Sequence, residues 1–198
     1  MGTHTQGERT MIRKAEPKDA AFAAPLIYQA IGDIAHTLTG AAAAGEAISL
    51  MAQFFAQKRN RLSYENAVIA MEGDEPVGLA LFYHGSQTEV LDRPFVEFVK
   101  ERTGIAPTLV KEARDDEFYL DSVAVRSDKR GKGIGKKLLA AFEQEAIQRG
   151  HDCIALLVDK ENPRAYQLYE ALGYRQDGTV MVSGHQFRHM VKRVLVSA

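Results

Sequence analysis

The segment RSDKRGKGIGKKLL (residues 126–139) joins a glycine-rich loop to a strongly basic helix start. Glycine stands at alternate positions, Gly131, Gly133 and Gly135, and six basic residues accompany one acid. Apolar spacing predicts an amphipathic helix from about Lys132 to Arg149, ending at Gly150. A helix N-terminus already carries about half a positive charge, so stability alone would favour Asp or Glu there.

Four basic residues nevertheless surround this helix start: Arg130, Lys132, Lys136 and Lys137. Their repulsion costs folding energy unless something negative lies at that end. A backbone without Cβ atoms can curl so that several N–H groups reach one anion. The segment therefore predicts a phosphate or pyrophosphate site between a strand and a helix. The alternative is a solvated basic turn whose glycine only starts the helix.

The composition excludes several classes of protein. The 198 residues suit one domain, and 45% apolar and 26% charged residues are ordinary for a globular protein. A net charge of −1 argues against a general nucleic-acid binder. The single cysteine, Cys153, excludes an internal disulfide and is interpreted as a structural thiol.

The N-terminus has no targeting signal that we recognise. Residues 1–9 lack the apolar core of a signal peptide and are expected to form a disordered arm, with one domain over residues 10–198. No apolar run approaches the roughly 20 residues of a membrane helix. We therefore expect a cytoplasmic protein without a membrane partner.

Strands and helices alternate along the chain, which predicts a mixed α/β sheet. Strands are expected at residues 10–15, 66–85 (a hairpin turning at Gly73–Asp74), 117–125, 151–159 and 173–196 (a hairpin turning near Ser183–Gly184). Helices are expected at residues 17–35, 41–58, 92–104 (with Asp92 as cap), 132–149 and 162–172.

The spacing of the glycines distinguishes between known phosphate motifs. No window fits the Walker loop, and the dinucleotide fingerprint lacks its third glycine. Arg130, Gly133 and Gly135 instead fit Arg-x-x-Gly-x-Gly. This pattern resembles the pyrophosphate-binding motif of the GNAT family of acetyl-CoA-dependent N-acetyltransferases.

A second motif, NPRAYQLYEALGY (residues 162–174), strengthens the resemblance. Asn162 suits an N-cap, Pro163 the first helical position and Gly173 the helix end. The segment is similar to the second GNAT signature, Asn-x-x-Ala-x-x-Leu-Tyr-x-x-x-Gly-Tyr/Phe. Taken singly, Tyr169 would be a core tyrosine, but two motifs in the right order argue against chance. The resemblance covers residues 67–196.

The resemblance implies a single α/β (α+β) domain and an activity. Its mixed, mostly antiparallel sheet would carry helices on both faces, with two central parallel strands splayed apart. The enzyme would move an acetyl group from acetyl-CoA to a primary amine by direct attack in a ternary complex. Tyr169 would protonate the departing thiolate. The residues implied in CoA binding are Val123, Ala124, Val125, Arg130, Gly131, Lys132, Gly133, Ile134, Gly135, Lys136, Asn162 and Tyr169.

The sequence identifies the general base less clearly than it identifies the CoA-binding residues. Strand alternation predicts Glu117, Tyr119, Asp121 and Val123 on one face. Family members often use a carboxylate of this strand, and we prefer Asp121 to Glu117. The alternative is that Asp121 only orders a loop or pairs with a nearby arginine.

The other polar residues are not interpreted as catalytic. The acidic run Glu112–Glu117 is expected to be a solvated loop, although it could attract a cationic amine. His185 and His189 lie four residues apart with no evident third ligand, so no metal site is predicted.

No motif in the sequence identifies the acceptor. A small amine or amino-acid-like acceptor is favoured over a protein, because residues 86–116 could form a lid over a compact site. A homodimer is compatible with the sequence. The alternative from another class is a non-catalytic acyl-CoA-binding module or sensor on the same fold.

Overall fold

One mixed sheet organises the part of the chain that the computed structural model describes, residues 10–195. Its strands are β1 (Met11–Lys14), β2 (Ala67–Glu72), β3 (Glu75–His84), β4 (Phe118–Val125), β5 (Cys153–Asp159), β6 (Arg175–Val182) and β7 (His185–Arg193). Their order across the sheet is β1-β2-β3-β4-β5-β7-β6. Among these strands only β4 and β5 pair in parallel, as expected for a mostly antiparallel sheet.

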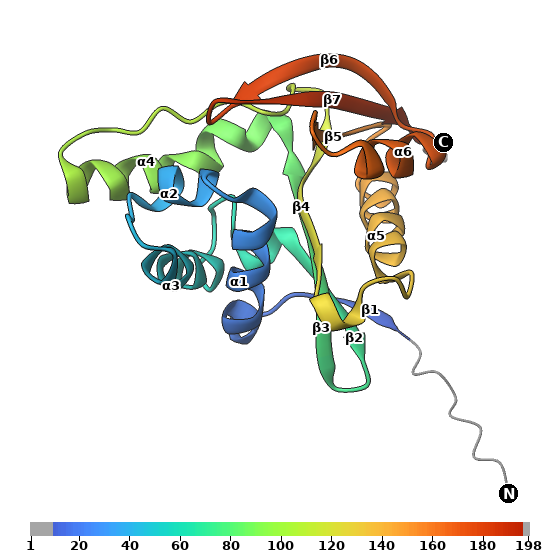
Figure 1. The fold of residues 1–198 in the computed structure, drawn as a ribbon, viewed down its shortest axis with the longest axis horizontal. Helices are drawn as coiled ribbons and strands as arrows, with labels where there is room; N and C mark the ends of the chain where they lie inside the picture. Colours follow the sequence, from blue (N-terminus) through green and yellow to red (C-terminus); the bar gives the residue numbers. More distant parts are fainter. Residues whose placement is uncertain (1–9, 196–198) are drawn as a thin grey trace, which may run out of the picture.

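Helices cover both faces of the sheet (Figure 1). They are α1 (Ala20–Ile31), α2 (Ile34–Thr39), α3 (Ala44–Phe55), α4 (Thr88–Thr103), α5 (Ile134–Gln148) and α6 (Pro163–Ala171). Helices α1 to α4 lie on one side, and α5 and α6 lie on the other. Each side buries its own apolar core, so the two helix layers hold the sheet between them.

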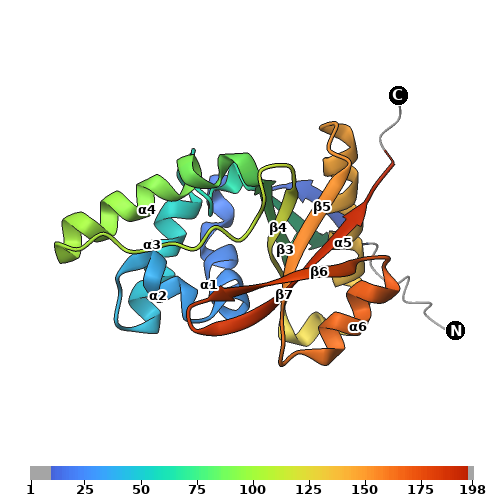
Figure 2. The same ribbon diagram turned by 90° about the horizontal axis from the view of Figure 1, so that it is seen from above.

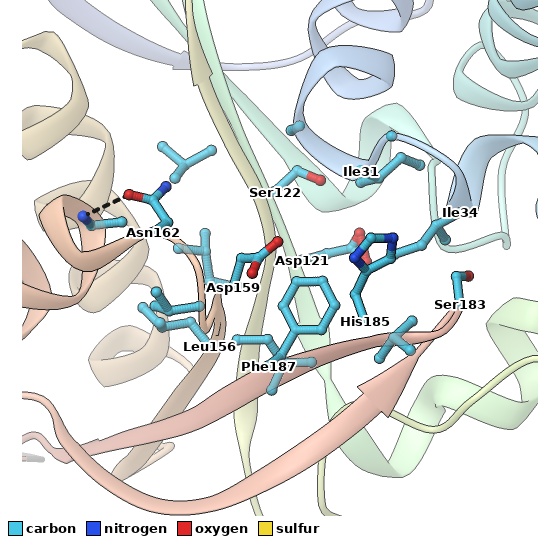
Figure 3. A pocket seen from close by; sticks show the side chains of 18 of the residues that line it. Ile31, Ile34, Asp121, Ser122, Leu156, Asp159, Asn162, Ser183, His185 and Phe187 are labelled. Carbon is cyan, nitrogen blue, oxygen red and sulfur yellow. Dashed lines mark hydrogen bonds between the residues drawn. The ribbon is translucent and has the colours of Figure 1, made fainter.

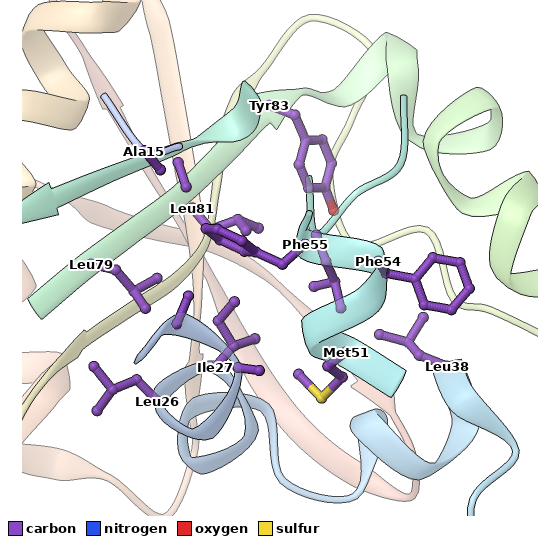
Figure 4. Packing of buried hydrophobic residues seen from close by; sticks show 14 of the residues in the cluster. Ala15, Leu26, Ile27, Leu38, Met51, Phe54, Phe55, Leu79, Leu81 and Tyr83 are labelled. Atoms are coloured by element: carbon purple, nitrogen blue, oxygen red, sulfur yellow. The ribbon is translucent and has the colours of Figure 1, made fainter. Parts of the chain in front are cut away.

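The two cores differ in the residues that fill them. On the α1 side, Ile27, Phe55 and Leu81 are fully buried in one cluster (Figure 4). On the α5 side, Phe82, Phe118 and Phe142 pack against one another, with each pair of ring centroids 5.5 Å apart. Burying such side chains provides most of the favourable free energy of folding.

The parallel strands β4 and β5 separate after a short contact. They pair only from Phe118 with Ile154 to Leu120 with Leu156. A bulge also interrupts the pairing of β3 with β4, because Leu81 faces Ser122 while Phe82 faces Leu120. Asp121 is the extra residue of this bulge. The predicted splay of the central strands is confirmed.

The bulge corrects the predicted alternation in β4. Alternation placed Val123 on the face of Tyr119 and Asp121. The inserted residue moves Val123 to the α5 side, where it packs against the second core, whereas Tyr119 belongs to the first. A sequence pattern of period two cannot show where an extra residue falls.

Two helix predictions were wrong in their bounds. The helix expected to reach Ala35 stops at Ile31, because Gly32 turns the chain with a φ of 55°, and α2 begins at Ile34. Helix α4 begins at Thr88, so Asp92 lies inside it and is not its cap. The Asp92 carboxylate instead accepts a hydrogen bond from Arg61 at 3.5 Å.

Both predicted hairpins are confirmed. Gly73 turns between β2 and β3 with a φ of 57°, and Ser183 and Gly184 turn between β6 and β7 with φ of 48° and 81°. The β6–β7 hairpin extends from the sheet toward α1 and α2 (Figure 2). The predicted arm, residues 1–9, lies outside the described residues. No helix in residues 10–195 has the length and apolar character of a membrane span.

Candidate active site

The glycine segment forms a loop that leads into the N-terminus of α5. Gly131 and Gly133 have φ of 78° and 80°, a conformation that side chains with a Cβ atom rarely adopt. Gly133 caps α5. The first amides of a helix have no intrahelical acceptor, so those of Ile134, Gly135 and Lys136 are available to an anion.

A cavity of about 700 Å³ lies over this helix start. Its charged lining residues, within the described chain, are all basic: Lys129, Arg130, Lys136 and Arg164. Of the predicted CoA-binding residues, Lys132 does not line it. Sequence reasoning missed Arg164, although it lies two residues after Asn162 in the second motif. We call this cavity the basic cavity.

The edge of β4 forms another wall of the basic cavity. Val123, Ala124 and Val125 all line it. Their strand pairs with β3 on one side, while β5 pairs with β4 only as far as Leu120 within the described residues. Among the backbone groups that β4 directs toward β5 after that point, the Val125 carbonyl oxygen accepts a hydrogen bond from Arg130 Nε at 3.1 Å. The others have no strand partner in the described chain and are available to a ligand.

Tyr169 lies where this wall meets α6. The Asn162 side chain caps the helix by accepting a hydrogen bond from the Ala165 amide at 3.0 Å. The Tyr169 ring is 9% exposed and packs edge-on against Tyr174 at 5.7 Å. Within residues 10–195 its hydroxyl makes no hydrogen bond, and burial raises its pKa to about 12. The phenol is therefore protonated at neutral pH.

Tyr169 also lines a second cavity, of about 680 Å³, and Figure 3 shows the side chains of most of its lining residues. Its walls come from the α1–α2 turn, β4, the end of β5 and the β6–β7 turn. Its acidic lining residues are Asp33, Asp121, Asp159 and Glu161, and none of the described lining residues is Lys or Arg. We call it the acidic cavity.

The two cavities share five lining residues: Gln29, Ala30, Val123, Asn162 and Tyr169. A molecule in the basic cavity and another in the acidic cavity would therefore meet beside the Tyr169 hydroxyl. The arrangement can bring two substrates into contact for a group transfer.

Asp121 lies at the wall of the acidic cavity and is nearly enclosed, with its side chain 2% exposed. Its Oδ1 accepts hydrogen bonds from Arg61 Nη2 at 2.5 Å and from the Tyr83 hydroxyl at 3.3 Å. Burial raises the pKa of Asp121, and the Arg61 charge opposes that rise only in part. Asp121 thus has both features that the sequence left as alternatives, a place at the cavity and an arginine partner.

Arg61 also binds two other buried carboxylates. Its Nη2 donates to Glu112 Oε1 at 2.9 Å, and its Nη1 to Asp92 at 3.5 Å. The Tyr119 hydroxyl donates to Glu112 Oε2 at 2.7 Å. This buried charge cluster was not predicted, because its members lie far apart in the sequence and no local pattern links them.

The acidic run expected to be a solvated loop is partly buried. Glu112 and Glu117 are 9% and 1% exposed. Glu117 accepts from the Arg114 amide at 2.8 Å and lies 3.0 Å from His189 Nε2, while His189 Nδ1 lies 2.5 Å from Asp177. Burial lowers the pKa of His189, but its two carboxylate partners together outweigh burial and raise it. Within residues 10–195, no three His, Cys, Asp or Glu side chains form a metal-binding group.

Comparisons with known proteins agree with this geometry. The sequence model of the Acetyltransferase (GNAT) family matches residues 38–174. A crystal structure of an acetyltransferase is 30% identical, with a TM-score of 0.77, over 93% of this chain and 100% of that one. An uncharacterized N-acetyltransferase of Bacillus subtilis, YhfO, is 28% identical over 84% of this chain and 90% of its own length.

A bovine relative carries a more specific name. Thialysine N-epsilon-acetyltransferase of Bos taurus is 39% identical over 36% of this chain. The chain spans about half the length of the curated relatives it matches: 56% of one acetyltransferase and 41% of the bovine enzyme.

Proposed function

Because this chain belongs to the acetyltransferase (GNAT) family, we propose that it moves an acetyl group from acetyl-CoA to a primary amine by direct attack in a ternary complex. The observation that carries the proposal is the meeting of a basic and an acidic cavity at Tyr169. The basic cavity suits the phosphates of CoA, and the acidic cavity suits an amine, which is cationic until it loses its proton.

The basic cavity offers two kinds of group to CoA. The amides at the start of α5 would donate to the pyrophosphate, and the helix dipole would add to the attraction. The side chains of Arg130, Lys136 and Arg164 would neutralise the phosphate charge, whereas Lys129 already pairs with Glu72 at 2.7 Å. The backbone of Val123 to Val125 would then pair with the amides of the pantetheine arm, as an added strand would.

The splay between β4 and β5 would direct the thioester toward the acidic cavity. Pairing of these strands ends at Leu120, and Tyr169 lies on the far side of the gap. The amine nitrogen would attack the thioester carbonyl carbon, so that a C–N bond forms as the C–S bond breaks. Unpaired N–H groups of β4 would stabilise the negative charge that develops on the carbonyl oxygen.

Three proton transfers are needed for this reaction to balance, because the nitrogen loses two protons and the thiolate gains one. The ammonium form of the acceptor must lose a proton before its nitrogen can attack, and we assign this proton to Asp121, directly or through a water. The departing thiolate must gain one, and we assign its donor as the Tyr169 hydroxyl, which is protonated at neutral pH. The attacking nitrogen loses its second proton after the C–N bond has formed, and this proton restores the Tyr169 hydroxyl, directly or through a water. The products are an acetylated amine, free CoA and one proton, which passes from Asp121 to solvent.

The deciding experiment is the release of free thiol from acetyl-CoA in the presence of a panel of primary amines. We expect amine-dependent thiol release, with the acetylated amine identified by mass spectrometry. Tight binding of acetyl-CoA without thiol release from any amine would favour the non-catalytic acyl-CoA sensor instead. The name of the bovine relative supports small amines as the first acceptors to test.

A further inference from the structure

The acidic cavity continues into a small enclosed chamber of about 80 Å³. Seven residues line both spaces: Ala30, Ile31, Ile34, Asp121, Leu157, Val182 and Phe187. Three others line the chamber without lining the acidic cavity, namely Arg61, Glu112 and Tyr119. The chamber therefore lies at the inner end of the proposed acceptor site and has room for a few water-sized groups.

The charge around this chamber is not balanced within the described residues. Three buried carboxylates, Asp92, Glu112 and Asp121, surround one guanidinium, that of Arg61. Burial raises the pKa of Asp92 to about 6, which still leaves it ionised at neutral pH. Excess negative charge out of water is costly unless a cation or a bound proton compensates it.

The walls between the chamber and Tyr169 suit a hydrocarbon chain. Ile31, Ile34 and Phe187 line the passage, and Figure 3 shows their side chains around the cavity. In the acidic cavity, Ser122 is 4% exposed and its hydroxyl has no hydrogen-bond partner among the described residues. Because this oxygen is itself buried, it would accept a hydrogen bond from an N–H group of the acceptor only after the Ser122 side chain rotates.

The described residues offer an acceptor carboxylate few partners, namely His185 in the acidic cavity and the unpartnered Nε of Arg61 beside the chamber. None of the described residues that line the acidic cavity is Lys or Arg, and the chamber's one cation, Arg61, already binds three carboxylates. An acceptor carboxylate would therefore face like charges. A second ammonium group would face Glu112 and Asp121.

Building on the proposed function, we propose that the acceptor is a dicationic alkyl amine without a carboxylate. One amine reacts beside Tyr169, the methylene chain lies along the apolar walls, and the second ammonium enters the chamber beside Glu112. Glu112 is a specificity-determining residue in this arrangement, because it lines the chamber but not the space next to Tyr169.

Three matched acceptors test the proposal in the wild-type protein: cadaverine, n-pentylamine and 5-aminovalerate. They have chains of similar length and differ at the far end, which is an ammonium, a methyl or a carboxylate. At saturating acetyl-CoA we expect kcat/KM for cadaverine, corrected for its two equivalent amines, to exceed that for n-pentylamine by about tenfold or more. 5-Aminovalerate should be the poorest acceptor. Equal rates for cadaverine and n-pentylamine, or a preference for 5-aminovalerate, would overturn the proposal, the latter pointing to the unpartnered Nε of Arg61.

A pair of substitutions tests the role of Glu112. Glu112→Gln keeps an oxygen for Arg61 and Tyr119 but removes the charge, so the ratio of cadaverine to n-pentylamine should fall toward one. Asp115→Asn is the control, because Asp115 is on the same segment, its side chain is 76% exposed, and it should leave the ratio unchanged. An unchanged ratio in Glu112→Gln would contradict the assignment of Glu112. If that variant does not fold, the wild-type comparison decides alone.

A binding measurement separates this inference from the proposed function. If none of the three amines releases thiol, acetyl transfer to alkyl amines fails. Calorimetric titration of the CoA-bound protein with the same three compounds would then still decide the charge preference. Tighter binding of cadaverine supports the chamber as an ammonium site, and equal binding of the three refutes it.

Discussion

The basic and acidic cavities have nearly the same volume, about 700 and 680 Å³, and opposite charge. The first is lined by four cations, Lys129, Arg130, Lys136 and Arg164, and by no described acid. The second is lined by four acids, Asp33, Asp121, Asp159 and Glu161, and by no described Lys or Arg. The two cavities are adjacent, because the same five residues, including Tyr169, line both of them.

The cavities also differ in how they are built. The basic cavity relies on backbone amides and on cations at the surface, most of them from one continuous segment. The acidic cavity and its chamber rely on side chains from distant segments, some of them fully buried. The difference teaches that binding of the shared donor and choice of the acceptor are physically separable, so substitutions should affect one without the other.

The largest expected effect is on the basic cavity. Gly133→Val forces a β-branched residue into a φ of 80° and puts a side chain where the phosphate would lie, so binding of CoA should fall below detection by calorimetry. Gly104→Val is the matched control. Gly104 has a φ of 79° and, like Gly133, open space around its Cβ position, but it caps α4 away from both cavities. Equal CoA affinity in the two variants would show that Gly133 is not part of the phosphate site.

The next effect is at the junction of the cavities. Tyr169→Phe keeps the ring that packs on Tyr174 and removes only the hydroxyl. We expect kcat to fall by roughly 10²-fold, the usual effect of a positioned acid, with no change in the dissociation constant of acetyl-CoA. Single-turnover kinetics with calorimetry would measure both. Unchanged turnover would make Tyr169 a packing residue and leave thiolate protonation to water.

A smaller effect is expected in the acidic cavity. Asp121→Asn should lower kcat/KM about tenfold at neutral pH, which is less than the roughly 10²-fold or more that a general base usually contributes, and leave CoA affinity intact. In the wild type the ionised carboxylate is the active form, so activity should fall as pH drops through the pKa of Asp121, which burial raises. The variant should lack this step.

The control for Asp121 is its neighbour in the charge cluster. Asp92→Asn also removes a carboxylate partner of Arg61, but Asp92 lines neither the acidic cavity nor the chamber. Its pH–rate profile should keep the wild-type step. Loss of the step in both variants, or in neither, would assign Asp121 a structural role.

The smallest expected effect is that of ionic strength, which should weaken the interactions of exposed charges more than those of buried charges. Raising the ionic strength from about 0.1 M to about 1 M shortens the screening length from about 10 Å to about 3 Å. The dissociation constant of CoA should rise several-fold, because Arg130 and Lys136 are exposed. The ratio of cadaverine to n-pentylamine rates should change by less than about twofold, since the chamber is enclosed. A larger change in that ratio would show that the charge preference arises at the surface.

Much of the basic cavity could be predicted from the sequence because its parts are local. Gly131 and Gly133 adopt the positive φ that only glycine tolerates easily, and Asn162 caps α6 through the amide of Ala165. Each of these features depends on residues within a few positions. Lys132 is the exception in this segment, since its side chain turns out not to line the cavity. Whether a basic side chain faces the cavity or solvent depends on how the loop packs.

For the acceptor site, the sequence predicted a location but not the contacts of its side chains. The sequence identified Asp121, but not that a bulge opposite Leu81 and Phe82 would isolate it. It gave no sign that Arg61 would bind Glu112 and Asp121, which lie 51 and 60 residues away. The acidic run looked solvated because a charged residue is normally exposed unless a partner is brought to it.

The sequence alone therefore determined most of the strands and helices, the glycine-rich start of α5 and the position of Tyr169 on α6, because hydrophobic periodicity, capping and glycine conformations act over one or two turns. Only the tertiary structure decided the break at Gly32, the burial of Glu112 and the charge of the chamber. The physical reason is that burial and ion pairing depend on contacts between distant segments, and their energies exist only once the sheet and its helices have assembled.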